Sequence, residues 1–373
     1  MTTEIEAAAA RLRDVVRTAT AGLVGREQLA ELMVLAAVAQ EHLLIIGPPG
    51  TAKSAVVRRV AQALGGRYFE YLLGRFTEPS ELFGPVDLRK LREGTVETDV
   101  SGMLPEADVA FLDEVFLGST AILNTLLSVL NERRFRRGHT HHECPLRLCV
   151  GAANALPDDD SLAAFADRFL LHAFVDAVPD HALEALLEGG WRSERSAPSH
   201  CADLADVDLL CSAVARVDVE TARGEIAALI RRLRAAGLVL SDRRIVKAQK
   251  LVAAAAVLAG RLQATSADLW PLYYVMPTRE TQAAAQDVLR DAFADVANPT
   301  LRSAAELASL QPRSRVARLM EAARECLAVE PADAPRPAAE AVLREIDANF
   351  SADTLPAELE PLRTRLVARA GGT

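Results

Sequence analysis

Short apolar runs alternate with amphipathic stretches along the first half of the chain. The apolar runs, each bounded by Gly, Pro or charged residues, predict buried strands; they lie at 42–46, 68–72, 109–114, 146–152 and 169–174. Between them, 52–64 and 119–132 carry apolar residues three and four positions apart, which predicts helices with one buried face. Strands that alternate with helices indicate a parallel sheet with helices on both faces.

Beyond residue 178 the strand patterns stop. Residues 180–295 carry almost only helical patterns, and so does the tail beyond 300. Two segments interrupt the first half: 74–102 is punctuated by Gly and Pro, and 134–145 has the pattern of a β-hairpin. We therefore expect an α/β part followed by an all-helical part.

Composition and charge narrow the class of protein. The chain has 373 residues, 50% of them hydrophobic, and a formal net charge of -9. It can build packed cores, and its acidic balance argues against nucleic-acid binding by the whole surface. Five scattered cysteines without a CxxC pair are typical of reduced thiols. The acidic N-terminus and the lack of an apolar run of ~18 residues favour a cytoplasmic protein without a membrane span.

A phosphate-binding loop of the Walker A type is predicted between the first strand and the helix that follows it. Its residues are Gly47, Pro48, Pro49, Gly50, Thr51, Ala52, Lys53 and Ser54. A nucleoside triphosphate needs backbone N–H donors, a cation on its β and γ oxygens and a hydroxyl for Mg²⁺; the Gly-rich backbone, Lys53 and Ser54 would supply these in order. The general pattern has Gly before the lysine, whereas this chain has Ala52, which we expect to be accommodated with a negative φ.

Two adjacent acids end the predicted strand at 109–114. Asp113 is expected to hold Mg²⁺ together with Ser54, and Glu114 to polarise the attacking water, an arrangement that suits ATP hydrolysis. Asn154 follows the strand at 146–152, where its side chain would reach the γ-phosphate and orient water. The predicted cofactors are therefore ATP and Mg²⁺.

These residues resemble the motifs of AAA+ ATPases, specifically the RavA-like branch of the MoxR family. The most specific pieces are GPPGTAKS (47–54), LLGRFTEPSELFGP (72–85), LPEADVAFLDEVFLGSTAILNTLLSVLNERRFRRG (104–138) and SDRR (241–244). Ala before the lysine is usual in that family. The resemblance implies an α/β nucleotide-binding core with a parallel five-stranded sheet at 1–178, inserts near 74–102 and 133–146, an all-α lid at 179–295 and a C-terminal helical bundle at 296–373.

The same resemblance assigns roles to single residues. It makes Asn154 the sensor 1 residue and Arg168 the arginine finger that reaches the ATP of a neighbouring subunit. Arg243 would be sensor 2 on the lid, with the adjacent Arg244 as an alternative. ATP would then lie at the subunit interfaces of a hexameric ring, so hydrolysis would depend on ring assembly.

The resemblance also implies a motor that remodels or matures a protein client, with a von Willebrand factor A domain protein as partner. Three alternatives stay open: a DNA-acting motor of the related helicase group, a magnesium-chelatase-like motor subunit, and a nucleotide-gated scaffold that does not hydrolyse ATP. The hairpin arginines favour a protein contact over nucleic acid, since Phe135 is the one aromatic residue among them; they are Arg133, Arg134, Arg136 and Arg137. We expect the hairpin tip, residues 139–144, to be solvated rather than a metal site.

Overall fold

The structure is a computed structural model, and its described residues form two compact units. It describes residues 2–193, 200–293, 296, 298–309, 319–320, 322–324, 326–327, 336–350, 355–356 and 358–370. The first unit comprises residues 1–21, 26–177 and 197–309, and the second comprises 22–25, 178–196 and 310–373. Every site residue predicted from the sequence lies in the first unit.

Five parallel strands form the sheet of the first unit, in the order β2-β3-β6-β1-β7. Their bounds are β1 Leu43–Ile46, β2 Tyr68–Leu72, β3 Val109–Asp113, β6 Leu148–Ala153 and β7 Leu171–Phe174. The predicted parallel five-stranded sheet is confirmed. Because the strands are parallel, all their carboxyl ends meet at one edge, here called the carboxyl edge, and their amino ends meet at the opposite amino edge.

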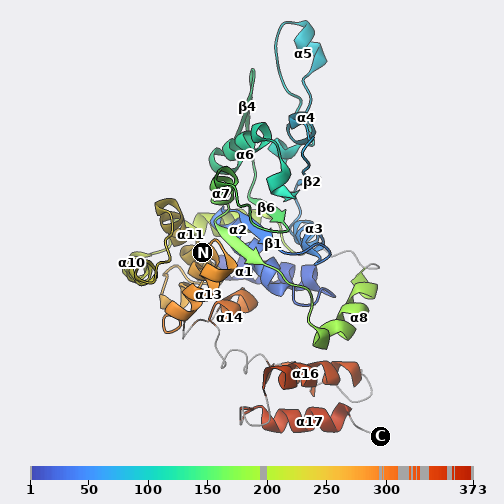
Figure 1. The fold of residues 1–373 in the computed structure, drawn as a ribbon, viewed down its shortest axis with the longest axis vertical. Coiled ribbons are helices and arrows are strands. Elements are labelled where there is room, and N and C mark those ends of the chain that lie inside the picture. Colours follow the sequence, from blue (N-terminus) through green and yellow to red (C-terminus); the bar gives the residue numbers. More distant parts are fainter. Residues whose placement is uncertain are drawn as a thin grey trace. The chain divides into compact units, whose positions relative to one another are not determined.

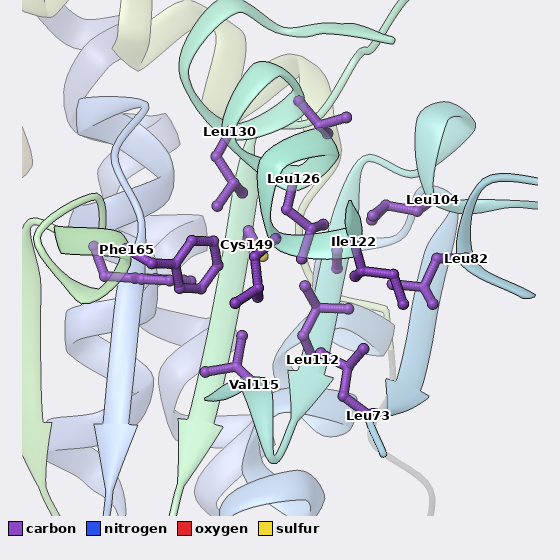
Figure 2. Close-up of a cluster of buried hydrophobic side chains, with 14 of the residues drawn as sticks. Leu73, Leu82, Leu104, Leu112, Val115, Ile122, Leu126, Leu130, Cys149 and Phe165 are labelled. Carbon is purple, nitrogen blue, oxygen red and sulfur yellow. The ribbon is translucent and has the colours of Figure 1, made fainter. Parts of the chain in front are cut away.

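Helices cover both faces of this sheet. The helices concerned are α1 (Thr2–Thr20), α2 (Glu27–Ala39), α3 (Lys53–Leu64), α6 (Thr120–Glu132) and α7 (Asp160–Ala166). α2 and α3 pack on one face, and α1 packs against both of them. On the other face, Leu112 and Cys149 contribute to one buried apolar cluster with Ile122 and Leu126 of α6 and Phe165 of α7 (Figure 2).

The apolar stripe predicted for α6 explains how this helix is held. Ser119 caps its N-terminus by accepting the Ile122 N–H (3.4 Å). Ile122, Leu126 and Leu130 recur every four residues and are all buried, so one face of the helix meets the sheet.

Two connecting segments of the first unit contact each other away from the sheet. The connection from β2 to β3 holds α4 (Pro79–Phe83), α5 (Leu88–Arg92) and the short helix η1 (Leu104–Glu106), and the hairpin consists of β4 (Arg134–Arg137) and β5 (Thr140–Glu143). The Thr98 N–H donates to Thr140 Oγ1 (2.7 Å), and the His139 N–H donates to the Val96 carbonyl (2.9 Å). The hairpin and α5 lie at the same end of the unit (Figure 1).

Arg133 joins the base of the hairpin to the start of the sheet. It caps the C-terminus of α6 with a φ of 54°. Its guanidinium donates to the carbonyls of Leu130 (2.7 Å) and Gln40 (3.0 Å). Arg134, Arg136 and Arg137 are exposed, so Arg133 does not belong to the basic surface that its position in the sequence suggests.

The rest of the first unit is helical. Its elements are α9 (Leu204–Val214), α10 (Glu220–Ala235), α11 (Asp242–Leu258), η4 (Ser266–Asp268), α12 (Leu272–Val275), α13 (Arg279–Val288) and α14 (Arg302–Ser309). α14 packs on α2, where the buried Glu31 carboxylate accepts the N–H groups of Ser303 (3.2 Å) and Ala304 (2.6 Å). Residues 302–309 thus belong to the first unit, although we predicted them as part of the C-terminal bundle.

The second unit contains η3 (Asp180–Ala182), α8 (Leu183–Ser193), α16 (Arg336–Asn349) and α17 (Glu360–Ala370). Ile346 of α16 and Leu362 and Leu366 of α17 share a small buried cluster. Arg344 of α16 pairs with Glu184 of α8 (2.7 Å). Much of the predicted bundle at 296–373 lies outside the described residues, and the predicted core and lid share one unit, so the three-part division stays a prediction.

The described part of the chain has neither a membrane-spanning helix nor a cluster of metal ligands. None of its helices combines the length and apolarity that a membrane crossing requires. No three His, Cys, Asp or Glu side chains converge there as a metal site would demand, and the five cysteines are free thiols.

Candidate nucleotide-binding site

The predicted phosphate loop joins the carboxyl end of β1 to the N-terminus of α3. The Gly47 N–H donates to the Ala153 carbonyl (3.1 Å), which ties the start of the loop to β6. Gly47 has no room for a side chain, because a Cβ there would lie 2.2 Å from the Val175 carbonyl oxygen. The Lys53 ammonium is buried and donates to the carbonyls of Gly47 (2.7 Å) and Pro48 (2.9 Å). Lys53 is therefore held inside the curve of the loop.

Ala52 departs from the expected backbone conformation. Its φ is 61° and its ψ is 24°, in the left-handed region, so the expectation of a negative φ is wrong. That region costs a non-glycine residue ~1–2 kcal/mol. The loop accepts the cost because the chain must reverse before α3 begins at Lys53; Gly50 has a positive φ in the same turn.

The acids of β3 lie at the same carboxyl edge as the loop. Asp113 is the last residue of β3, and Glu114, the next residue, is left-handed with a φ of 49°. Asn154, just after β6, donates through Nδ2 to Glu114 Oε1 (2.6 Å). Asp113 and Glu114 stabilise the charged Lys53 ammonium, but burial outweighs them and lowers the pKa of Lys53. The structure thus brings together the lysine, both acids and the amide that we predicted.

The donor set at this edge suits a magnesium nucleotide. Ser54 is the second residue of α3 and presents a hydroxyl, and Asp113 presents a carboxylate. Mg²⁺ prefers such oxygen ligands together with phosphate oxygens. The start of α3 also offers free N–H groups and the positive end of its dipole to a phosphate.

One arginine that contacts the phosphate loop was not predicted from the sequence. Arg26, at the start of α2, is buried and donates through Nε to the Thr51 carbonyl (2.9 Å) and through Nη2 to the Asp176 carbonyl (2.9 Å). The Asp176 carboxylate pairs with both terminal nitrogens of Arg279 (2.8 Å each) at the start of α13. The acceptors of Arg26 are backbone atoms, which leave no mark in a sequence pattern.

Arg168 does not lie at this site. It stands between α7 and the amino end of β7, where it lines a cavity of about 480 Å³ with Phe116, Asn124 and Asp159, among others. Its Nε is buried without a hydrogen-bond partner. The neighbouring Asp167 carboxylate is engaged by Arg244 (3.2 Å).

The two candidates for sensor 2 have different surroundings. Arg244 is 2% exposed and donates to the carbonyls of Val275 (2.9 Å), Phe169 (3.2 Å) and Leu170 (2.9 Å). Arg243 is partly exposed and contacts Asn131 at the end of α6. Both lie toward the amino edge, so neither reaches the phosphate loop of its own chain.

Family models match both parts of the first unit. A model of the MoxR domain in MoxR–vWA–beta-propeller ternary systems matches residues 10–212, more than half of the chain. A model of an AAA lid domain matches residues 224–289.

Similar proteins point the same way. Two uncharacterized proteins of Methanocaldococcus jannaschii are 35% identical over 246 residues (65% of each chain) and 34% identical over 251 residues (67% of this chain and 66% of the relative). The chain thus spans just under two thirds of the length of these relatives. The chaperone MoxR1 of Mycobacterium tuberculosis is 28% identical over 152 residues, 40% of each chain.

A solved structure matches the fold. A crystal structure of a candidate ATPase from Cytophaga hutchinsonii has a TM-score of 0.64 and 18% identity, and the match covers 79% of this chain and 97% of that one. The parallel sheet, the helical lid and the family model agree: the chain belongs to the MoxR family of AAA+ ATPases.

Proposed function

We propose that this chain hydrolyses ATP at the carboxyl edge of its sheet and uses the reaction to remodel or mature a protein client. The observation that carries the proposal is the hydrogen bond from Asn154 to Glu114, formed beside the buried Lys53. A structural acid pair would need no amide aimed at it from the neighbouring strand. The name of one relative, the chaperone MoxR1, supports the action on a protein client.

Each residue has a defined part in the proposed reaction. The loop N–H groups and Lys53 bind the β- and γ-phosphates, and Ser54 and Asp113 would hold Mg²⁺, which neutralises phosphate charge when bound. Glu114 accepts a proton from the attacking water while the water oxygen forms a bond to the γ-phosphorus. The bond from that phosphorus to the bridging oxygen breaks, and ADP and phosphate leave. Asn154 holds the Glu114 carboxylate in position and orients the water.

We propose further that Arg168 and Arg243 act on the nucleotide of a neighbouring subunit. Both lie away from the phosphate loop of their own chain, and Arg243 has a partly exposed guanidinium, whereas Arg244 is spent on backbone carbonyls. A ring in which each carboxyl edge meets the next subunit's amino edge would bring them to ATP. We keep the predicted hexamer as the form of this ring.

The partner and branch are also proposals. The matching family model is named for ternary systems that contain vWA and beta-propeller components, which supports a von Willebrand factor A domain protein as partner. The RavA-like branch stays a prediction that rests on the sequence motifs. The free cysteines suit the predicted cytoplasmic location.

Two other motors are kept as alternatives. A DNA-acting motor would need a basic surface; Arg134, Arg136 and Arg137 are exposed on the hairpin, whereas the guanidinium of Arg133 is turned toward backbone carbonyls. A magnesium-chelatase-like subunit would co-purify with a tetrapyrrole enzyme. An ATPase rate that rises on adding DNA would favour the first alternative, and a rate indifferent to DNA would exclude it.

Phosphate release from ATP tests the proposal directly. We expect Glu114→Gln to lower turnover by ~10²-fold or more while ATP still binds, since it removes only the proton acceptor. Lys53→Ala should abolish nucleotide binding. Glu132→Gln, at the exposed end of α6, is the matched control and should turn over ATP at the normal rate. If Glu114→Gln also turns over ATP normally, the chain is a scaffold and the proposal is wrong.

A further inference from the structure

We propose that Arg26 is a positioning residue of the nucleotide site, whose guanidinium holds the Thr51–Ala52 peptide with its N–H turned into the phosphate loop. This inference rests on the proposed binding of ATP by that loop. It assigns a role to a residue that precedes the loop by a whole helix and a strand.

The guanidinium of Arg26 is held in place by acceptors from two different segments. Arg26 is 8% exposed, and two of its nitrogens donate to carbonyls from different segments, Thr51 in the loop and Asp176 after β7. A buried cation is costly unless its N–H groups are bonded. The side chain is therefore fixed by both acceptors at once and can act as a rigid reference for the loop.

The planarity of the peptide fixes which way the Ala52 N–H points. In a trans peptide the C=O and the next N–H point in opposite directions. Arg26 draws the Thr51 carbonyl away toward α2, so the Ala52 N–H must face the other way. Turned that way, the N–H would enter the loop, where the Lys53 ammonium donates to the carbonyls of Gly47 and Pro48.

Ala52 carries backbone strain in this loop. In this orientation of the peptide, Ala52 holds the left-handed conformation, which costs ~1–2 kcal/mol relative to the ordinary regions. Without a bond to the Thr51 carbonyl, the peptide would gain by rotating away. Arg26 thus offsets the absence of glycine before the lysine.

Asp176 connects this arrangement to the helical lid. Its carbonyl accepts from Arg26, and its carboxylate pairs with Arg279, whose guanidinium lies 5.3 Å from the centre of the Phe174 ring. The ion pair is largely exposed and is worth at most ~1 kcal/mol. The lid therefore adjusts the position of the Asp176 segment, while the Arg26 bond sets the loop.

A double-mutant cycle between Arg26 and Ala52 tests the inference, with the affinity for Mg²⁺–ADP measured by calorimetry. We expect Arg26→Ala to weaken ADP binding at least tenfold. Ala52→Gly alone should change the affinity less than twofold, because Arg26 already holds the peptide. In the Arg26→Ala background, Ala52→Gly should restore the affinity at least threefold, because glycine adopts the left-handed conformation without strain. A purely structural Arg26 would give additive effects.

Controls separate this inference from simpler outcomes. Arg147→Ala removes a partly buried arginine paired with Asp108 (2.6 Å) and Asp208 (2.7 Å) at the amino edge; it should lower the melting temperature and leave ADP affinity unchanged. Asp176→Asn keeps the carbonyl and should change affinity less than threefold. If Arg26→Ala does not fold, Arg26→Lys replaces it in the cycle with the same expected signs.

Two results would overturn the inference. Arg26→Ala or Arg26→Lys with the normal ADP affinity would show that the loop orients without this residue, and additive effects in the cycle would deny the coupling to Ala52. If the unmutated chain fails to bind ADP at all, the proposed function is wrong, and this inference fails with it.

Discussion

The two edges of one sheet use polar residues in different ways. At the carboxyl edge, Ala52 and Glu114 hold left-handed backbone conformations, and Glu114 bonds to Asn154 across neighbouring strands. At the amino edge, the left-handed residues Gln40 and Arg133 are C-caps of α2 and α6, a common place for this conformation, and charged side chains are buried among partners. Arg244 is 2% exposed, and the Glu41 carboxylate, 1% exposed, pairs with Lys247 (2.5 Å) and Lys250 (3.5 Å).

This difference between the two edges indicates that the carboxyl edge serves the proposed chemistry and the amino edge serves stability. Strained residues persist where a geometry is needed for chemistry, and the surrounding structure must offset them. Buried ion pairs need complete sets of partners, and breaking one is costly. The amino edge therefore holds the lid on the sheet. In the proposed ring, Arg168 and Arg243, which do not bond to backbone carbonyls as Arg244 does, would act on the nucleotide of another subunit.

The largest effect is expected from Arg168→Ala. If this arginine stabilises charge on the transferring phosphoryl group of a neighbour, its loss should lower turnover by ~10³-fold or more. Subunits with Arg168→Ala mixed with subunits with Glu114→Gln should recover part of the activity, because an interface that pairs the carboxyl edge of the former with the amino edge of the latter is intact on both sides. Phosphate release across a series of mixing ratios measures this.

Absence of recovery at every mixing ratio would place Arg168 in the structure of its own subunit. The control is a mixture of Glu114→Gln with Lys53→Ala subunits. Both changes lie on the carboxyl edge, so this mixture should stay inactive.

The next effect compares the adjacent arginines of α11. Arg244→Met removes the donors to three backbone carbonyls and to Asp167, and it should lower the free energy of unfolding by ~3–5 kcal/mol. Arg243→Met, its matched control on the same helix, should change that energy by less than ~0.5 kcal/mol and yet lower ATP turnover. Urea unfolding and phosphate release report the two properties. The reverse pattern would exchange the roles of the two residues.

A smaller effect concerns acid stability at the amino edge. Burial lowers the pKa of His172 to about 3, and its Nδ1 lies 2.7 Å from the Pro277 carbonyl. A histidine whose pKa is lower in the folded chain contributes stability that is present above pH ~6.5 and lost as the pH falls toward the folded value, by on the order of a few kcal/mol. His42, whose pKa burial also lowers, adds the same sign.

His172→Asn keeps a donor for the Pro277 carbonyl and removes the titration. It should flatten the loss of unfolding free energy between pH 6.5 and pH 4, measured by urea unfolding at each pH. His141→Asn, at an exposed position of the hairpin, is the control and should leave the slope as it is. An unchanged slope in His172→Asn would assign the acid sensitivity to other groups.

The smallest effect belongs to the carboxyl edge. Ala52→Gly relieves the left-handed strain but frees the unfolded chain, so the unfolding free energy should rise by no more than ~1 kcal/mol. Thermal unfolding measures this shift. A clear loss of stability would mean that the Ala52 methyl group is needed for packing and that the strain is unimportant.

The sequence predicts most features of the carboxyl edge and few of the contacts at the amino edge. Apolar runs mark strands because burial follows side-chain chemistry, and the loop and acids follow those strands directly. The φ of Ala52 depends on where the chain must go next, which composition does not encode. The choice between Arg243 and Arg244 depends on the rotation of α11, since adjacent helical residues point about 100° apart. The bonds of Arg26 end on carbonyls, which every residue has.

The contacts of Arg133 have a mechanical consequence. If the β4–β5 hairpin were attached only to the end of α6, it would be free to move, and a force on its tip would act on α6 alone. Here the Cys144 N–H closes the hairpin base on the Arg133 carbonyl (2.8 Å), and the Arg133 side chain grips the Gln40 carbonyl just ahead of β1. A pull on the tip therefore reaches the strand that carries the phosphate loop at its far end. Because a strand resists stretching, β1 would transmit a force on the hairpin tip to the phosphate loop.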